Sequence, residues 1–438
     1  MANIKAFKGY RYNSEKIENI GSVISPPYYN ISSAEKAEMY ELNEYNSIRL
    51  FSGQKEESDT ETDNRFTRSA SFLKEWIAND VLKRDDKPSI YMYEQTIEVY
   101  NVQYSNRTFV TLLELEEFNE TRIMPCEEVR EISLKDRYDL LAATNADLSM
   151  ICCLYVEREK ELLNLMNELS EERPDAEFES KDGIHQRVWA ITYQPTIDFI
   201  TEQFKNMPLY ITDGQTRYET CLQYRNYMKA NNPEHNGTEP YNYTMVSLAN
   251  SNSDGIVILP VHREVKCKRF REDYFVAGVQ DHFKIEKIIV DSDDEELVET
   301  MKKQIATTKP ETRIAAYCGG DYFYRLTLVD KDFVKTDILP EMSKAYCGLD
   351  IVALNKLVIE DVLHIKEEEY EEKVEATRSH ASCLKHVQEG ICDIMFIVNP
   401  VKTEQIKNIT AAGEKMPKNT ISVFPKPSVG VIINIKEN

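Results

Sequence analysis

The segment from Tyr210 to Arg225 holds the residue types in this chain that are best suited to chemistry. It reads Tyr-Ile-Thr-Asp-Gly-Gln-Thr-Arg-Tyr-Glu-Thr-Cys-Leu-Gln-Tyr-Arg: a short apolar start, one glycine, then a polar run with helical composition. This pattern predicts a strand, a turn at Gly214 and a helix. Free N–H groups and the dipole at the start of a helix attract anions. The segment therefore predicts an anion site at this turn.

Each residue of the turn has a chemical use. Gly214 lets the chain turn sharply, and Gln215 and Thr216 would lie at the helix start. Arg217, one position further, can clamp a phosphate through two parallel hydrogen bonds. Asp213 can hold a metal ion or accept a hydroxyl proton. The alternative is structural: Asp213 caps the helix and Arg217 pairs with a neighbouring acid.

A second candidate is Pro260-Val-His-Arg, which ends an apolar run that starts at Ile256. A histidine beside an arginine at a strand end suits phosphate contact or proton transfer. The alternative for His262 is a purely structural role.

A third pattern lies in the predicted helix over residues 378–389. His380, Cys383 and His386 nearly share one face of that helix, but no fourth ligand is evident from the sequence. We therefore expect an ordinary helix there and no metal site.

Composition limits the class of partner. The 438 residues include 53 Lys and Arg against 75 Asp and Glu, a net charge of −22. This balance argues against a broad nucleic-acid surface, although a local basic pocket remains compatible with it. No run approaches the roughly 18 apolar residues of a membrane span, and the start of the chain lacks signal-peptide features. Nine irregularly spaced cysteines fit a reducing cytoplasm. We expect a cytoplasmic protein with a small-molecule substrate or nucleotide as partner, and neither nucleic acid nor membrane.

Helical and strand patterns alternate along the chain, which indicates an α/β or mixed α+β fold. The predicted helices are 66–82, 162–169, 196–205, an acid-capped helix opening at 291, 351–363 and 378–389. The predicted strands are 88–95, 109–115, 148–156, 188–193, 209–211, 256–263, 322–329, 392–398 and 429–435. The charged stretch 170–182 is expected to be a solvated loop. The length exceeds one ordinary core, so two or three lobes are expected, with a change of composition near residue 285.

Eight segments in order resemble one known family over nearly the whole chain. They are Phe7-Lys-Gly-Tyr-Arg-Tyr, Val23-Ile-Ser-Pro-Pro-Tyr, Pro88-Ser-Ile-Tyr-Met-Tyr-Glu-Gln, Asp136-Arg with Ala143-Thr-Asn-Ala-Asp-Leu-Ser, Asp213-Gly-x-x-Arg-Tyr-Glu, Ile258-Leu-Pro-Val-His-Arg, Asp393-Ile-Met-Phe-Ile-Val-Asn-Pro, and Met416-Pro with Phe424-Pro-Lys. On these segments the chain is similar to the domain-of-unknown-function 1015 family, whose usual core motif is Asp-Gly-His-His-Arg-Tyr-Glu.

The resemblance implies a ParB/sulfiredoxin-like core with mixed sheets and flanking helices, shared with free-serine kinases. It implies an N-terminal lobe over 1–285, which contains the nucleotide- and phosphate-binding core, and a C-terminal α/β lobe over 286–438 that packs on it. The implied activity is phosphoryl transfer from ATP or ADP, with Mg²⁺, to a small hydroxyl compound, free L-serine first. Such chemistry depends on positioning, charge neutralisation and a base.

The resemblance also implies roles for individual residues. The phosphate-binding set is Gly214, Gln215, Thr216, Arg217, Arg263 and Lys426. The catalytic set is Asp213, Glu127 and His262, with Asp213 also the metal ligand. The substrate-binding set is Tyr28, Tyr29, Asn30 and Glu219.

The chain departs from the family at polar motif positions. Gln215-Thr216 replace the usual His-His, Tyr29 an Asp, Cys126 a His, and Asn419-Thr-Ile a Lys-Ser-Thr. Apolar framework positions such as Leu148, Leu259 and Phe396 are kept. This pattern preserves packing while it removes acid, base and charge. The alternative is therefore a catalytically inactive relative that binds a nucleotide or phosphorylated metabolite as a sensor or partner protein.

Overall fold

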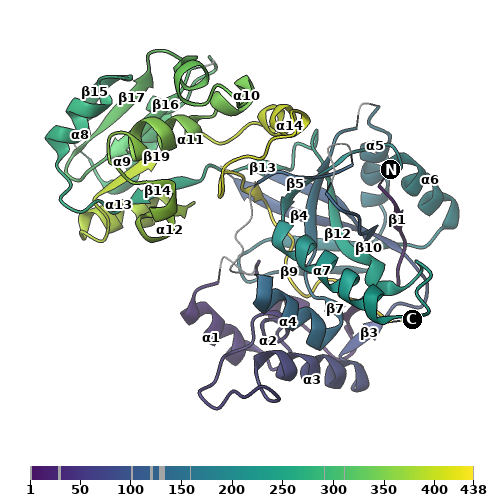
Figure 1. Ribbon diagram of the computed structural model, residues 1–438. Coiled ribbons are helices and arrows are strands. Elements are labelled where there is room, and N and C mark those ends of the chain that lie inside the picture. The colour runs from purple at the N-terminus through teal and green to yellow at the C-terminus, as the bar shows by residue number, and fades with distance from the viewer. Residues whose placement is uncertain are drawn as a thin grey trace. The chain divides into compact units, whose positions relative to one another are not determined.

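The computed structural model describes residues 2–27, 31–99, 102–118, 122–127, 134–157, 159–290, 292–309 and 311–437. These residues form two compact units. The first comprises residues 1–125, 129–257 and 423–438, and the second comprises 126–128 and 258–422. The mixed α+β class predicted from the sequence is confirmed (Figure 1). A specific kinship of the core with ParB and sulfiredoxin stays a prediction.

The unit boundary differs from the one expected near residue 285. Strand β14 (His262–Val265) lies inside the sheet of the second unit, between β19 and β18. The last residues, 423–438, return to the first unit. A change of composition does not reveal such a boundary, because hydrogen bonding to distant strands decides which unit a segment joins.

The first unit is built on a nine-stranded mixed sheet. Its order is β6-β11-β8-β12-β5-β4-β10-β9, and β1 pairs with β5. The strands are β1 (Ile4–Lys5), β4 (Ile90–Val99), β5 (Val102–Glu114), β6 (Ile123–Pro125), β8 (Ile151–Tyr155), β9 (Ala176–Glu179), β10 (His185–Ile191), β11 (Leu209–Asp213) and β12 (Tyr243–Asn250). Two short pairs accompany the sheet: β2 (Tyr10–Tyr12) with β3 (Leu82–Arg84), and β7 (Ala146–Asp147) with β21 (Asn434–Ile435).

Helices cover both faces of this sheet. They are α1 (Ser33–Leu42), α2 (Ile48–Phe51), α3 (Arg65–Ala78), α4 (Leu134–Thr144), α5 (Glu161–Ser170), α6 (Gln194–Phe204) and α7 (Gln215–Asn231), with short 3₁₀ turns at Ile20–Ser22 and Pro240–Asn242. Side chains alternate along the strands: Ile90 and Met92 of β4 join one core cluster, and Tyr91 and Tyr93 the other. Because strand side chains point to opposite faces in turn, each face of the sheet has its own core.

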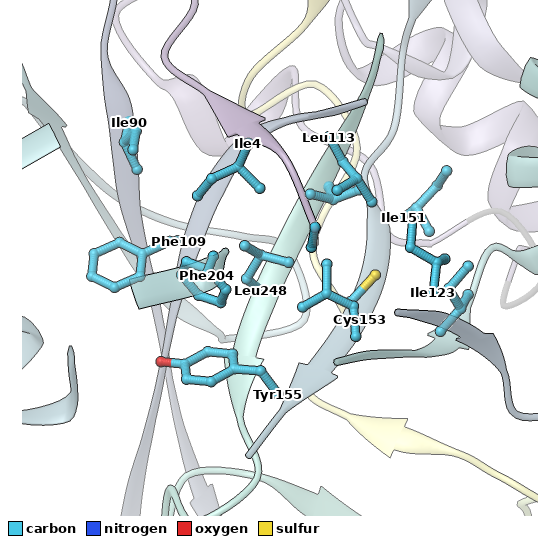
Figure 2. Close-up of a cluster of buried hydrophobic side chains, with 14 of the residues drawn as sticks. Ile4, Ile90, Phe109, Leu113, Ile123, Ile151, Cys153, Tyr155, Phe204 and Leu248 are labelled. Carbon is cyan, nitrogen blue, oxygen red and sulfur yellow. The ribbon is translucent and has the colours of Figure 1, made fainter. Parts of the chain in front are cut away.

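The two cores use different helices. On one face, α5, α6 and α7 contribute Leu162, Phe204 and Tyr218. Figure 2 shows part of this cluster, with Phe204 beside Leu248 of β12. On the other face, α3 contributes Leu73 and Trp76. Strand β11, which leads into α7, is buried from Leu209 to Thr212, and its last residue, Asp213, is partly exposed.

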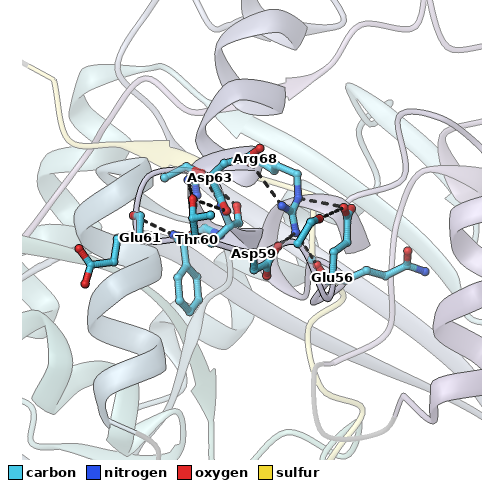
Figure 3. A network of polar contacts seen from close by, with 12 residues as sticks. Glu56, Asp59, Thr60, Glu61, Asp63 and Arg68 are labelled. Atoms are coloured by element: carbon cyan, nitrogen blue, oxygen red, sulfur yellow. Dashed lines mark hydrogen bonds and ion pairs between the residues drawn. The ribbon is translucent and has the colours of Figure 1, made fainter.

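A polar network holds the loop that precedes α3. Arg68 of α3 forms ion pairs with Asp59 (2.7 Å), Asp63 (3.4 Å) and Glu56 (3.7 Å), as Figure 3 shows. Asn64 caps the helix, because its side chain accepts hydrogen bonds from the backbone N–H groups of residues 66 and 67. This network lies on a surface loop, and such pairs contribute little to stability.

The second unit has a six-stranded sheet in the order β15-β17-β16-β19-β14-β18. The strands other than β14 are β15 (Phe283–Ile289), β16 (Arg313–Tyr317), β17 (Tyr322–Leu328), β18 (Val374–Thr377) and β19 (Ile394–Ile397). Residues 126–128 belong to the second unit, and the chain enters this unit again at β13 (Val257–Ile258) and leaves it at β20 (Val423–Phe424). The helices are α8 (Glu272–Val279), α9 (Asp294–Ile305), α10 (Lys344–Cys347), α11 (Asp350–Ala353), α12 (Tyr370–Lys373), α13 (His380–Gln388) and α14 (Thr403–Ala411).

Four local predictions need correction. The run 256–263 is not one strand, because β13 ends before Pro260, which has no N–H to give to a sheet. The predicted helix 351–363 is α-helical only through Ala353 and continues as a π-helix, Leu354–Glu360. The expected loop 170–182 contains β9, and only Asn434–Ile435 of the run 429–435 is a strand.

Candidate functional site

The predicted strand, glycine turn and helix are present in the first unit. Strand β11 ends at Asp213, Gly214 precedes the helix with φ of 85°, and α7 begins at Gln215. This left-handed conformation costs little only for glycine. A Cβ atom on residue 214 would also lie 2.6 Å from the Nη2 atom of Arg217. Glycine therefore permits both the turn and the close approach of the guanidinium group.

Asp213, Arg217 and Lys426 form a compact charged cluster at this turn. The Nη2 atom of Arg217 donates to Oδ2 of Asp213 at 2.6 Å. The Nζ atom of Lys426 donates to Oδ1 of the same carboxylate at 2.8 Å. The three side chains are 16%, 19% and 8% exposed, in the order Asp213, Arg217, Lys426. Two cations thus share one carboxylate, and the cluster has a net positive charge.

Burial acts on the amine of Lys426. Loss of hydration lowers its pKa to about 7, because a charged ammonium group is disfavoured away from water. The carboxylate of Asp213 opposes this by stabilising the charged form. The ion pair with Asp213 therefore helps to keep the amine protonated in spite of its burial.

Ser149 completes the cluster and was not assigned a role from the sequence. Its Oγ atom accepts a hydrogen bond from Nη1 of Arg217 at 2.6 Å. The signal was available, since Ser149 ends one of the segments that carry the family resemblance. The guanidinium plane is therefore fixed from two sides, by a carboxylate and by a hydroxyl group.

Gln215 and Thr216 are the first two residues of α7. Within the described ranges, the Oε1 atom of Gln215 is buried and has no hydrogen-bond partner, and its Nε2 atom lies 3.5 Å from Oε1 of Glu219. Buried carbonyl oxygens usually accept a hydrogen bond. Thr216 offers its backbone carbonyl to the hydroxyl of Thr220 at 2.8 Å. Gln215 can therefore accept a hydrogen bond from a bound molecule.

A cavity of about 60 Å³ lies beside the cluster, lined in part by Ser149, Arg217 and Thr220. Asp147 borders the same cavity, but it is committed elsewhere: Lys436 (2.9 Å) and Asn434 (2.7 Å) both donate to its Oδ2 atom. The cavity has room for a group of the size of phosphate rather than for a nucleotide. A nucleotide would need most of its volume outside this cavity.

The second unit contains three of the predicted catalytic or phosphate-binding residues: Glu127, Arg263 and His262. The Oε1 atom of Glu127 accepts hydrogen bonds from the backbone N–H groups of Thr420 (2.8 Å) and Ile421. Arg263 donates to the carbonyl oxygens of Val261 (3.0 Å) and His262 (3.2 Å), and to those of residues 418 (3.3 Å) and 419 (3.1 Å).

Glu127 and Arg263 therefore hold the same short segment, 418–421, through its N–H and C=O groups. This is the segment in which the family's Lys-Ser-Thr is replaced. Arg263 donates hydrogen bonds to four backbone oxygens and is buried, with 4% of its surface exposed. Burial lowers the pKa of Arg263 to about 10, and the nearby carboxylate of Glu127 partly offsets this. The predicted catalytic role of Glu127 and the predicted phosphate-binding role of Arg263 require these contacts to change.

His262 is buried in the second unit, with 1% of its surface exposed. Its Nδ1 atom faces the backbone N–H of Val398 at 3.4 Å, and its Nε2 atom has no hydrogen-bond partner among the described residues. Its ring lies 5.1 Å from that of His380, measured between ring centres. Burial and the neighbouring positive groups lower its pKa to about 3. His262 is therefore neutral at physiological pH.

The residues of the third sequence pattern lie on α13 (His380–Gln388). Of its residues, His386 of α13 pairs through Nδ1 with Glu264 at 2.7 Å, whereas Cys383 is fully buried. No cluster of three or more His, Cys, Asp or Glu side chains suited to a metal occurs within the described part of the chain. Both oxygens of Asp213 face cations, so a metal ion at that carboxylate would have to displace Arg217 and Lys426. The metal role of Asp213 stays a prediction.

The predicted substrate residues Tyr28, Tyr29 and Asn30 lie outside the described residues. Glu219 is described and lies one turn along α7 from Gln215. No described helix is long and apolar enough to cross a membrane. All nine cysteines are present as free thiols.

Comparison with known proteins decides the family. The profile of the family described as "Protein of unknown function (DUF1015)" matches residues 4–389. The chain belongs to this family. None of the curated proteins matches it.

Several solved structures are similar to this DUF1015 chain at low identity. A free serine kinase in complex with AMP has 10% identity and a TM-score of 0.36, over 75% of this chain and 91% of that chain. A conserved hypothetical protein from Pyrococcus furiosus has 11% identity and a TM-score of 0.32, over 74% and 97%. SbnI with a C-terminal truncation, from Staphylococcus aureus, has 11% identity and a TM-score of 0.35, over 74% and 87%.

Proposed function

We propose that this DUF1015 protein is a nucleotide-dependent phosphotransferase that acts on a small hydroxyl compound, with free L-serine the first candidate. The observation that carries the proposal is the cluster at the start of α7, in which Arg217 and Lys426 both contact Asp213. Two cations beside the amino end of a helix attract phosphate oxygens. The choice of L-serine rests on the family resemblance of the motif segments.

The phosphate groups of ATP or ADP would compete with Asp213 for the two cations. Arg217 is suited to two parallel hydrogen bonds to phosphate oxygens, and Lys426 supplies a point charge. Once released from these contacts, the carboxylate of Asp213 is available as a base. Binding of the nucleotide would then also free Asp213 to act as a base.

In the proposed step, the substrate hydroxyl oxygen attacks the terminal phosphorus of the nucleotide. A new O–P bond forms, the bond from phosphorus to the bridging oxygen breaks, and the shortened nucleotide leaves with that electron pair. Asp213 takes the hydroxyl proton. The unpartnered Oε1 atom of Gln215 can accept a hydrogen bond that orients the substrate hydroxyl or amine. Catalysis of this kind depends on positioning and charge stabilisation.

The test is direct. Purified protein is incubated with ATP or ADP, Mg²⁺ and a panel of hydroxyl compounds that includes L-serine, and phosphorylated product is measured by mass spectrometry. We expect product with at least one acceptor and none with the folded Asp213→Asn variant. Absence of product with every acceptor, from protein that binds nucleotide, would leave only the second function below.

The second candidate is a relative that binds a nucleotide or phosphorylated metabolite without turnover. The contacts that favour it are those of Glu127 and Arg263, which hold backbone groups of residues 418–421. The absence of the His-His pair at residues 215 and 216 also favours it. The double variant Gln215→His with Thr216→His separates the two candidates. An active but slow enzyme should gain turnover, whereas a dedicated sensor should retain its affinity and stay silent.

A further inference from the structure

A cavity of about 610 Å³ lies within the second unit and is a candidate for a second site. It lies where β19 ends, beside the start of β16 and the first turns of α11 and α14. Cavities that bind small molecules usually measure about 300–1,000 Å³ and combine apolar walls with a few convergent polar groups. The size of this cavity thus suits a small metabolite.

The lining of the cavity carries a small excess of positive charge in a chain that is strongly acidic overall, because five lysines stand against the four acids Glu311, Asp332, Asp350 and Glu404. Five lysines line it: Lys309, Lys331, Lys335, Lys344 and Lys402. Two of them are already engaged, because Lys335 donates to the carbonyl oxygens of Pro340 and Met342, and Lys344 pairs with Asp332 at 2.9 Å.

The other three lysines make no direct ion pair with any residue that the structure describes. Lys402 acts on Asp350 through its charge, which favours the ionised form of that carboxyl group. These amines can therefore neutralise an anion that enters the cavity, and charge-assisted hydrogen bonds to such an anion are the strong kind.

Asp350 adds an acidic group to the lining of the cavity, in contrast to the lysines. Its Oδ2 atom accepts a hydrogen bond from Nδ2 of Asn399 at 3.0 Å, and Thr312 also bonds to the carboxyl group. Burial raises the pKa of Asp350, and these two neighbours and Lys402 oppose the rise. A carboxyl group at this position accepts hydrogen bonds from a hydroxyl or ammonium group.

The backbone beside Asp350 is unusual. The helix that starts at Asp350 changes from α to π geometry at Leu354 and remains so through Glu360. Such π segments occur frequently at functional sites. The π segment itself lies outside the cavity and follows the turn whose first residues, Asp350 and Ile351, line it.

We propose that this cavity is a second ligand site, which takes a small metabolite carrying one phosphate or carboxylate group and one hydroxyl or ammonium group. The lysines at the wall bind the anionic group, and Asp350 with Asn399 binds the donor group. The inference is independent of the cluster at Asp213 and of the proposed phosphotransferase activity.

The first test is isothermal titration of the full chain with four probes and inorganic phosphate. Two probes carry phosphate, glycerol 3-phosphate and O-phosphoethanolamine. Two carry carboxylate, 3-hydroxypropanoate and β-alanine. We expect at least one of the four to bind with a Kd below about 1 mM. Failure of all four, or binding no tighter than that of inorganic phosphate, overturns the proposal.

Variants locate the site. Asp350→Asn, which keeps the side-chain shape, and Lys331→Met with Lys402→Met should each weaken the best probe at least tenfold. Lys385→Met, at an exposed position on α13 outside the cavity, and Arg217→Ala should leave its affinity unchanged. Loss of binding in Arg217→Ala with retention in the cavity variants would assign the probe to the first unit and refute the inference.

Hydrogen exchange keeps the proposal testable if a cavity variant fails to fold. With wild-type protein and the best probe, peptides covering residues 331–351 and 398–408 should exchange more slowly, and peptides of α7 should not change. Protection confined to α7 would contradict the inference.

Discussion

The amine of Lys426 lies 2.8 Å from a carboxylate oxygen of Asp213, although 213 positions separate the two residues in the sequence. Arg217 occupies the other oxygen of the same carboxylate. Without bound phosphate, the carboxylate of Asp213 therefore pairs with both cations of the cluster. An anion that takes both cations releases this acid, so phosphate binding and the exposure of a base are coupled.

The Asp213→Asn variant tests this coupling. Loss of the carboxylate should abolish product formation but should not weaken nucleotide binding, because Arg217 and Lys426 no longer have a competing anion. We expect a loss of about 2 kcal/mol in the free energy of unfolding, the usual scale for hydrogen bonds to charged groups. Parallel titration and product assays check this. A nucleotide affinity that falls together with activity would show that Asp213 organises the site instead of competing for it.

Gly214→Ala should separate backbone strain from phosphate binding. Alanine at φ of 85° costs about 1–2 kcal/mol of stability, and its Cβ would push the guanidinium of Arg217 away from Asp213. Gly183→Ala is the matched control, because its φ is 76° and nothing lies within 4 Å of the added atom. In chemical denaturation, Gly183→Ala should lose only the strain energy, whereas Gly214→Ala should also lose the energy of the displaced contact between Arg217 and Asp213. Only Gly214→Ala should change nucleotide affinity, and an equal change in both would refute the local explanation.

His262 should make the protein acid-sensitive. Its pKa is about 3 in the folded chain against an ordinary value of 6.5, so the unfolded chain binds a proton first as the pH falls. Stability due to this group is full above pH 6.5 and decreases below it, by about 3 kcal/mol between pH 6.5 and 4. The free energy of unfolding, measured by denaturation across this pH window, should fall less steeply for His262→Gln than for the wild type. Equal slopes for the wild type and His262→Gln would contradict the prediction.

The sequence predicted the turn at Gly214 because every signal for it is local. An apolar strand, a glycine and a helical run follow one another within a few residues, and hydrophobic periodicity identifies such elements well. The pairing of Arg217 with a neighbouring acid, left open as an alternative, is what the structure shows. The family resemblance selected Lys426, but nothing in the local pattern indicated its partner.

The failures have a common physical cause. The run 256–263 is apolar up to Val261, yet Pro260 cannot donate to a ladder and the strand stops before it. The run 351–363 has helical composition, but composition does not distinguish α from π geometry, which tertiary packing decides. The contacts of Glu127 and Arg263 with residues 418–421 join distant segments. Such contacts depend on chain topology, which no single window of sequence contains.

In the proposed function, the start of α7 binds the phosphate groups of a nucleotide through Arg217 and Lys426. The most direct measurement is titration of ATP and ADP into the wild type, Arg217→Ala and Arg68→Ala, each with its unfolding free energy determined. Arg68 is the matched control, since it is a partly exposed arginine that pairs with acids on a surface loop (Figure 3). We predict that Arg217→Ala weakens nucleotide binding at least tenfold, while Arg68→Ala binds as the wild type does. Equal affinity in all three folded proteins, or no nucleotide binding by the wild type, would contradict the account.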